Sequence, residues 1–436
     1  MKILTLFLAL ITLLSVGNLQ AQTAKVRPYR PGDGLSINAA RKYNVRLSGI
    51  IQPMVETRNY PGLKEQGNYT RFRMRRMIAK VAGNTAKEKI GYQVQVDLTG
   101  SSDAGGDGTA NNYLMDAWVS YEPNDNLELV VGQENAPTDS RELGMSSNAL
   151  SLVERSQVAL AFSSIREFGF FANYKLNAGR NGILQPHLAI TNGDGANVFT
   201  KDHGGLKYGG RLDYLPFGAF VHGGQYRQAD IEHELTPKLV IGATYSLNKG
   251  ISDRRGRQSG TILYLDSLGN ESLPDYTKVG VDFLFKYRGF SMLGEFVNAE
   301  ATVPGDIRQR VRADGSAATT FLVNGIQDVP SYVKGRMILG SGFNLQAGYF
   351  FLNGISIDGR YSKINPATNS FLRNALFYNR TDYYSLCLGK YLGRHYGAKV
   401  QAMVTYATPK ASSETITGQA LTGNEITSML MFTFAL

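Results

Sequence analysis

Apolar and polar residues alternate with a period of two along most of the chain. In one segment, Ile90, Tyr92, Val94, Val96 and Leu98 alternate with Gly91, Gln93, Gln95, Asp97 and Thr99. The same alternation occurs at 278–288, with Leu284 on the polar side as an exception, and in the final residues 425–436. Because successive side chains of a β-strand point to opposite faces, the pattern predicts many strands with one apolar and one polar face.

The segments between these strands alternate between short and long. Short links fall at 84–89, 123–126 and 178–182, at Gly289, at Ser341–Gly342 and at Gly393–Tyr396. Long polar links fall at 58–68, 100–111, 135–166, 192–205, 250–276, 303–330, 362–380 and 409–423. We place strands near 45–57, 69–83, 89–99, 112–122, 127–134, 167–177, 183–191, 206–215, 237–249, 277–288, 290–302, 343–361, 381–392, 397–408 and 425–436. With the strand that lies between the link 303–330 and the turn at Ser341–Gly342, the count is sixteen. Segment 216–236 is too long for a turn and leaves open a further strand.

The period of two alone cannot distinguish a membrane barrel from a soluble β-sandwich, because both folds have one apolar and one polar face. The alternation of short and long links can, because it is typical of a membrane barrel. No stretch after the N-terminal region reaches the roughly 18 apolar residues of a transmembrane helix. We predict an all-β fold, a transmembrane antiparallel β-barrel of about sixteen strands with short periplasmic turns and long outer loops, the third of which folds inward. A barrel of that size has a lumen too wide for side chains to fill. We expect aromatic girdles at the strand ends from Tyr60, Tyr69, Tyr113, Tyr121, Tyr287, Tyr391 and Tyr406.

The N-terminal residues have the pattern of an export signal. Lys2 precedes an apolar run, Ile3–Val16, and Leu19-Gln20-Ala21 forms a cleavage site. The apolar run is short for a spanning anchor. We therefore expect a signal peptide at 1–21, a periplasmic N-terminal segment at 22–44 and the barrel at 45–436, located in the outer membrane of a bacterial cell.

Composition excludes several other classes of protein. The single cysteine, Cys387, rules out a disulfide scaffold and cysteine metal clusters. The five histidines are scattered and form no nucleophile–base pair, so we expect neither catalysis nor a cofactor nor a metal. We interpret Glu232-His233-Glu234 as a solvated charge cluster. The net charge of +10 favours anionic partners, but the chain contains no recognisable nucleic-acid-binding module.

A cationic ladder stands out on the second strand. Arg71, Arg73 and Arg75 share one face, about 6.6 to 7 Å apart, while Phe72 and Met74 share the other. Facing the lumen, these guanidiniums would offer anions several weak, overlapping sites. Arg76 and Lys80 have the parity of Phe72, so they must snorkel to an interface or follow a bulge. The alternative is that the arginines pair with acids on an inward loop and serve structure alone.

The third outer loop, 135–166, is the longest link, and long loops commonly have a function. Its charged residues Arg141, Glu154 and Arg166 are candidates for a constriction inside the lumen. The alternative is an ordinary surface loop.

Several short motifs together resemble the phosphate-selective porin O and P family. They are Phe72-Arg73-Met74-Arg75-Arg76, Val131-Gly132-Gln133 with Pro137, Glu154-Arg155-Ser156, Arg166-Glu167-Phe168-Gly169, Asn192-Gly193, and Arg211 with Pro216-Phe217-Gly218. The resemblance covers roughly residues 45–250. It implies a sixteen-stranded trimeric outer-membrane porin with cationic residues at the constriction, and by position Arg71, Arg73, Arg75 and Arg155 become the channel-lining candidates. Loop 135–166 contains no lysine, unlike the lysine-rich constriction of the phosphate-selective members.

We therefore predict a porin rather than an enzyme, embedded in outer-membrane lipid as a homotrimer. It would pass small hydrophilic solutes by passive diffusion, with a mild preference for anions. The resemblance adds phosphate as a candidate anion, and the absence of lysine from loop 135–166 favours a general anion preference over phosphate selectivity. An adhesin or receptor with a plugged, non-conducting lumen is the alternative. A channel for a specific organic solute is a third option, but the lumen-facing positions are mostly small, polar or charged rather than aromatic.

Overall fold

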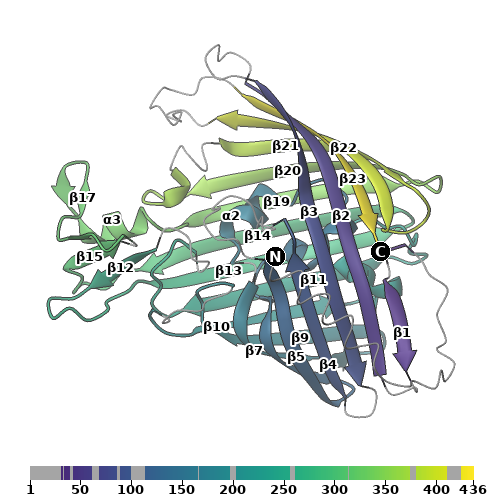
Figure 1. The fold of residues 1–436 in the computed structure, drawn as a ribbon, viewed down its shortest axis with the longest axis horizontal. Coiled ribbons are helices and arrows are strands. Elements are labelled where there is room, and N and C mark those ends of the chain that lie inside the picture. The colour runs from purple at the N-terminus through teal and green to yellow at the C-terminus, as the bar shows by residue number, and fades with distance from the viewer. Residues whose placement is uncertain are drawn as a thin grey trace, which may run out of the picture.

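The strands close into a sixteen-stranded antiparallel barrel in the computed structural model (Figure 1). The structure describes residues 31–32, 34–39, 43–60, 68–85, 89–99, 113–164, 166–196, 203–255, 261–312, 314–373, 380–409 and 424–436. The barrel strands are β2 (Tyr43–Asn59), β3 (Tyr69–Thr85), β4 (Ile90–Asp97), β5 (Leu114–Asn124), β6 (Leu127–Asn135), β7 (Arg166–Tyr174), β9 (Gly182–Thr191), β10 (Lys207–Leu215), β11 (Lys238–Asn248), β13 (Asp275–Tyr287), β14 (Phe290–Thr302), β19 (Gly340–Phe350), β20 (Ile355–Pro366), β21 (Arg380–Tyr391), β22 (Ala398–Pro409) and β23 (Glu425–Ala435). The last strand pairs with the first, from Ile50↔Ala435 to Asn59↔Ile426, so the barrel has no open edge.

Two short strands extend the sheet at one end of the barrel. Strand β1 (Leu35–Ala39) pairs with the beginning of β2, and β8 (Leu176–Ala178) pairs with β9. The expected signal peptide, 1–21, lies outside the described residues.

The alternation of short and long connections is confirmed. Short turns join the strands at the end of the barrel where β1 lies, except for the link 216–237 between β10 and β11, and the other long connections extend from the opposite end (Figure 1). There, β12 (Ile262–Leu265), β15 (Gln309–Arg312), β16 (Ala317–Ala318), β17 (Leu322–Val323), β18 (Ile326–Gln327) and the helix α3 (Val329–Lys334) form a cap. Its apolar core continues onto the outer ends of β13, β14 and β20 and onto Val158 and Phe162 of the third outer loop. In this core Phe321 packs edge-on against Tyr332, with ring centroids 5.3 Å apart.

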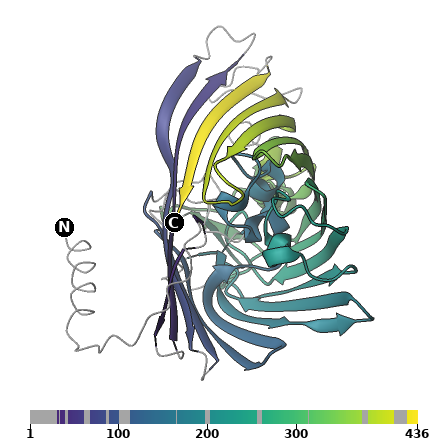
Figure 2. The ribbon, with the colours of Figure 1, turned by 90° about the vertical axis from the view of Figure 1, so that its right-hand side faces the viewer.

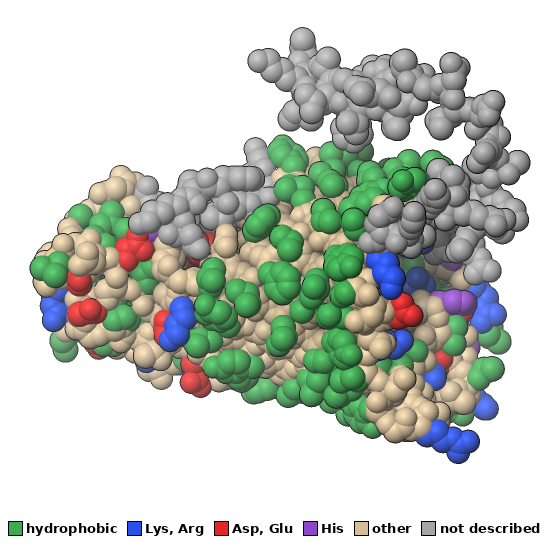
Figure 3. All heavy atoms as spheres, turned by 90° about the horizontal axis from the view of Figure 1, so that it is seen from below, with side chains coloured by type: hydrophobic (Ala, Val, Ile, Leu, Met, Phe, Trp, Pro, Cys, Tyr) green, Lys and Arg blue, Asp and Glu red, His purple; other side chains and the backbone are tan. Residues whose placement is uncertain are grey.

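The outward face of the barrel is an apolar belt. Figure 3 shows hydrophobic side chains across the middle of the strands, with charged side chains gathered towards the two ends. On β21 the outward Leu386 and Leu388 are 58% and 53% exposed, whereas Cys387 between them is fully buried inside. Lipid rather than a second protein layer covers such a belt, and closure of the sheet pairs every strand with two neighbours. Among the described residues, no helix is long and apolar enough to span a membrane.

A charge on this belt tests which face meets lipid. Leu386→Lys should lower the free energy of unfolding by about 2–4 kcal/mol, the cost of a lysine near the bilayer midplane. Gln93→Lys, on the lumen face of β4, is the matched control and should change it little. Urea unfolding in lipid vesicles, followed by fluorescence of the single tryptophan, Trp118, measures both. Equal losses in the two variants would contradict the assignment of faces.

Two sequence expectations are wrong in detail, and the further strand left open at 216–236 is not formed. The tight turn expected at Ser341–Gly342 does not exist, because β19 runs through these residues and the turn falls at 351–354, which splits the strand expected near 343–361 into β19 and β20. Segment 216–236 contains no strand; its described residues include only a 3-10 segment, η3 (Val221–Tyr226). Tyr391 belongs to no girdle, since it is 1% exposed and packs inside the barrel.

Candidate channel constriction

The third outer loop lies inside the barrel, which confirms the predicted inward fold. This loop, called L3 here (residues 136–164), runs from β6 to β7 and contains two 3-10 turns, η1 (Arg141–Gly144) and η2 (Ser147–Ala149), and the short helix α2 (Gln157–Phe162). Most of its residues are buried although the loop belongs to no strand. Figure 2 shows its ribbon enclosed by the strands.

Short polar residues define the local turns of L3. The Ser140 side chain accepts a hydrogen bond from the Glu142 backbone nitrogen at the start of η1, and Ser156 Oγ caps α2 by accepting from the Ala159 nitrogen at 3.0 Å. Glu142 Oε2 accepts from the Ser156 nitrogen at 2.7 Å and so ties η1 to α2. L3 is therefore a folded unit rather than a loose loop.

Arg141 anchors L3 to the barrel wall at β10 and β13. Its Nε donates to Asp282 Oδ1 at 2.6 Å and its Nη2 to Asp213 Oδ1 at 2.7 Å. Arg211 contacts the same two carboxylates, at 2.8 Å for Asp213 and 2.7 Å for Asp282. All four side chains are buried, so two arginines and two aspartates form one compensated cluster.

Glu154 anchors the other side of L3 to β3. Arg75 contacts its carboxylate through Nε and Nη2, and Arg76 Nη2 lies 3.0 Å from its Oε2. Burial alone would raise the pKa of the Glu154 carboxyl, but Arg75 and Arg76 outweigh it and lower the pKa to about 2. Glu154 is therefore an ionised anchor at neutral pH.

A β-bulge explains how neighbouring arginines reach the same side. The pairing of β2 with β3 shifts between Gln52, which pairs with Arg76, and Pro53, which pairs with Met74. Arg75 is the extra residue, so Arg76 also turns inward, where it is fully buried. Of the two sequence-based alternatives for Arg76, the bulge is confirmed.

Arg71 and Arg73 lie nearer the outer end of β3 and gather on a second carboxylate. Their Nη2 atoms lie 3.0 and 2.9 Å from Glu56 Oε2, and Arg58 Nε lies 2.8 Å from Glu56 Oε1. The Arg71 and Arg73 side chains remain 45% and 34% exposed, while Glu56 is fully buried. The structural alternative for these arginines described acids on an inward loop. Glu154 of L3 is such an acid, whereas Glu56 lies on the wall strand β2.

The two remaining candidates, Arg155 and Arg166, are buried. Arg155 Nη2 donates to the Met145 carbonyl at 2.8 Å, so its guanidinium braces L3 from within. Arg166 Nε donates to Asp116 Oδ1 at 2.7 Å, which fixes the start of β7 to β5. The structure therefore brings Arg71, Arg73, Arg75 and Glu154 together and places Arg141, Arg155 and Arg166 at separate points around L3.

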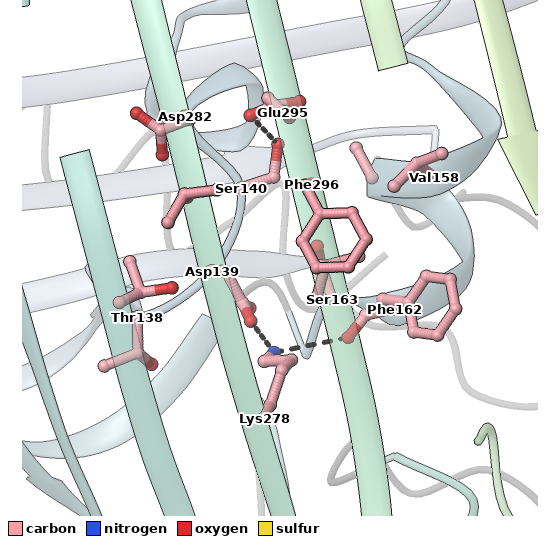
Figure 4. Close-up of a pocket in the computed structure, with 15 residues that line it drawn as sticks. Thr138, Asp139, Ser140, Val158, Phe162, Ser163, Lys278, Asp282, Glu295 and Phe296 are labelled. Atoms are coloured by element: carbon pink, nitrogen blue, oxygen red, sulfur yellow. Dashed lines mark hydrogen bonds and ion pairs between the residues drawn. The ribbon is translucent and has the colours of Figure 1, made fainter. Parts of the chain in front are cut away.

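A small cavity separates L3 from the wall at β13 and β14 (Figure 4). Lys278 contacts the Asp139 carboxylate and donates to the Phe162 carbonyl at 3.2 Å, and Ser140 Oγ donates to Glu295 Oε1 at 2.6 Å. The cavity is bounded by these links, so it belongs to the anchoring of L3. Among the described residues, no group of three His, Cys, Asp or Glu side chains is placed to hold a metal ion.

Sequence reasoning missed the acidic partners. Glu56, Asp139 and Glu142 were not singled out, although alternation along β2 places Glu56 on the lumen face with Gln52 and Met54. The interpretation of Glu232-His233-Glu234 as a solvated cluster is wrong for Glu234, which is 2% exposed and accepts from the Val221 nitrogen at 2.7 Å.

The two halves of the barrel wall differ in how far their lumen-facing side chains are covered. On β13 to β22, Lys286, Asn344, Asp358, Lys399 and Gln401 are 0–2% exposed. On β3 to β7, the lumen-facing Lys80, Gln93, Gln95, Glu134 and Asn173 are only half-buried. L3 therefore covers most of the first half. In the second half it contacts β3 through Arg75 and Arg76, and residues such as Val130 and Phe171 are also buried, so water reaches only the half-buried side chains there.

A closed sixteen-stranded barrel with an apolar outer belt and an inward third loop defines an outer-membrane porin. The family model of the phosphate-selective porins O and P matches residues 53–320, and the chain belongs to this family. It is a channel of the bacterial outer membrane for small solutes.

Several solved structures are similar to this chain at low sequence identity. An anion-selective porin from Comamonas acidovorans is 11% identical, with a TM-score of 0.49, over 91% of this chain and 100% of that one. The outer membrane channel DcaP of Acinetobacter baumannii is 12% identical, with a TM-score of 0.49, over 91% and 99% of the two chains. OmpF of Salmonella typhi, in complex with daunomycin, is 10% identical, with a TM-score of 0.49, over 91% and 99%. No curated protein sequence matches the chain.

Proposed function

We propose that this porin prefers anions mildly and that Arg71 and Arg73 carry the preference. The supporting observation is the ratio of charges at the contact between β2, β3, L3 and β23. Arg58, Arg71 and Arg73 contact Glu56, Arg75 and Arg76 contact Glu154, and Arg58 and Arg380 contact Glu425. Six guanidinium groups share three carboxylates there, so the cluster keeps an excess of positive charge.

Within this cluster the arginines divide by exposure. Arg75 and Arg76 are buried and hold L3, which suits a positioning role. Arg71 and Arg73 have part of their guanidinium groups free to meet a solute, and guanidinium groups bind anions through charge-assisted hydrogen bonds. A few such weak contacts favour entry of an anion without trapping it, as conduction requires.

This arrangement of charges supports a general preference for anions over selectivity for phosphate. L3 has no lysine, and its two arginines contact carboxylates (Arg141) or backbone carbonyls (Arg155). The proposal is therefore passive diffusion of small hydrophilic solutes, with chloride-sized and larger anions preferred over cations. We also infer a homotrimer, as membership of the family implies, and a channel rather than an enzyme.

Replacement of both exposed arginines tests the anion preference. Arg71→Gln with Arg73→Gln should shift the reversal potential in a KCl gradient towards cation selectivity and leave the fold intact, because both side chains are partly solvated. Arg312→Gln, on the exposed outer cap, is the matched control and should not shift it. An unchanged reversal potential in the double variant would overturn the proposal.

Two measurements on the wild-type protein, phosphate block and conductance itself, distinguish the remaining alternatives. Block of chloride current by low phosphate concentrations would show phosphate selectivity in place of a general preference. No conductance at all from correctly folded wild-type protein would support the plugged receptor or adhesin.

A further inference from the structure

The connection between β10 and β11 lies at the end of the barrel where all other links are short, yet it spans residues 216–237. It does not hang into the periplasm. Phe220, Gln228, Ala229, Asp230 and Ile231 are 1–4% exposed, although none of them lies on a strand. Figure 2 shows its ribbon, which includes η3, enclosed by the barrel strands together with L3. We call residues 219–234 the periplasmic strap.

Gln228 joins the strap to L3. Its Oε1 accepts from the Ser151 nitrogen at 2.6 Å, its Nε2 donates to Glu142 Oε1 at 2.9 Å, and its backbone nitrogen donates to the Ala149 carbonyl at 3.1 Å. Gln346 on β19 donates to the same Oε1 at 3.1 Å. One buried side chain thus connects the strap, L3 and the far wall.

The next two residues fix the strap to the wall and to the short turns. The Ala229 carbonyl accepts from Lys286 Nζ at 2.8 Å and from the Tyr396 hydroxyl at 2.6 Å. Asp230 Oδ2 accepts from the Gly289 nitrogen at 2.7 Å. The strap therefore starts at β10, crosses the mouth and reaches the turn that joins β21 to β22.

Apolar packing fills the space between the strap and L3. Phe220 belongs to a buried cluster with Met145 and Leu150 of L3 and with the lumen-facing Val240, Leu284 and Leu293. The lumen-facing side of a porin strand is normally polar. Apolar side chains at these positions indicate permanent contact with protein rather than with water.

We propose that the periplasmic strap is a second constriction element, which holds L3 from the periplasmic side and confines solutes to the half of the lumen lined by β3 to β9. This rests on the proposed channel function. It explains why the lumen-facing residues of β13 to β22 are buried along their length, including Lys286, Asp358 and Lys399, which lie on the periplasmic half of their strands. The strap then sets the size limit of the periplasmic exit, as L3 does within the barrel.

Removal of the strap tests the proposal. In the first variant an Asn-Gly turn replaces residues 216–237, since such two-residue turns connect antiparallel strands directly. Single-channel conductance in a planar bilayer should rise about two-fold, because a segment that crosses the mouth of a water-filled barrel is removed. Larger neutral sugars should also enter, as measured by liposome swelling.

A point variant keeps the test decisive if the shortened barrel fails to fold. Gln228→Ala removes the link to L3 and should increase both the open-channel noise and the frequency of conductance steps above the wild-type level. Gln225→Ala is the matched control, because Gln225 lies on the same strap and its Oε1 has no hydrogen-bond partner among the described residues. Folding of every variant is checked by heat-modifiable migration on a gel.

The outcomes separate this inference from the proposed function. A silent wild-type protein would overturn the channel itself. If the wild-type protein conducts, unchanged conductance and sugar entry in the shortened variant would overturn the proposed role of the strap. If the shortened variant does not fold, a Gln228→Ala channel with the same noise and conductance steps as Gln225→Ala would overturn it.

Discussion

Glu142→Ala should lower the free energy of unfolding by about 3–5 kcal/mol, because it removes one partner of a buried ion pair and leaves the other charge unpaired. The Glu142 carboxylate is fully buried and accepts from Arg360 Nη1 at 3.2 Å, from Gln228 Nε2 at 2.9 Å and from the Ser156 nitrogen at 2.7 Å. Arg360, on β20, is itself buried. The measurement is urea unfolding in lipid vesicles, followed by Trp118 fluorescence.

The matched control for this variant is Glu271→Ala. Glu271 contacts His203 at 3.0 Å on the outer surface, where both side chains are partly exposed, and exposed ion pairs contribute little. A Glu142→Ala loss no larger than that of the control would contradict the role of Glu142 as the junction of L3, the strap and β20.

Removal of L3 should have the largest effect on the channel. Replacement of residues 140–163 by a short Gly-Ser linker should raise single-channel conductance several-fold and weaken ion selectivity, because L3 occupies the lumen from β3 to β22 and its Glu154 holds Arg75 and Arg76. The barrel itself should persist, since its backbone hydrogen bonds run between strands and do not depend on the loop. Conductance steps in a planar bilayer measure the effect.

A deletion in the outer cap is the control for loop removal. Residues 267–270 form an exposed turn in the long connection between β11 and β13, outside the barrel, so their removal should leave conductance close to the wild-type value. Equal conductance of the L3 variant and the wild-type protein would mean that solutes do not pass L3.

The way L3 is held has a consequence for how its charges act. Each anchor joins an arginine or lysine to a carboxylate on the opposite element, as in Arg141 with Asp282, Arg75 with Glu154 and Lys278 with Asp139. Buried ion pairs often add little net stability relative to apolar packing, but a wrong register of the loop would leave several charges unpaired. Such pairs therefore select one position of L3 and add little to the stability of the protein.

The turn prediction at Ser341–Gly342 failed because the glycine there allows close packing and does not reverse the chain. Ser341–Gly342 was predicted as a turn, but a Cβ at Gly342 would lie 2.7 Å from Val158 Cγ1 of α2, so the glycine allows L3 to pack closely against β19. The turn occurs instead at 351–354, where Phe351 and Leu352 looked like strand residues. Neither error changed the strand count, because one expected turn was exchanged for another.

The barrel, its strand number, the sides on which short and long connections lie, and the cationic face of β3 can be predicted from the chain alone. These follow from a period of two, from link lengths and from charge, all of which are local properties of the chain. Which charges are free to act depends on long-range contacts in the folded protein. Arg71, Arg73 and Arg75 look alike along the strand, but L3 brings Glu154 to Arg75 from 79 residues away, and the strap reaches L3 through Gln228. Contacts over such distances depend on where two inward segments meet inside a closed wall, and no periodicity along the chain encodes that meeting.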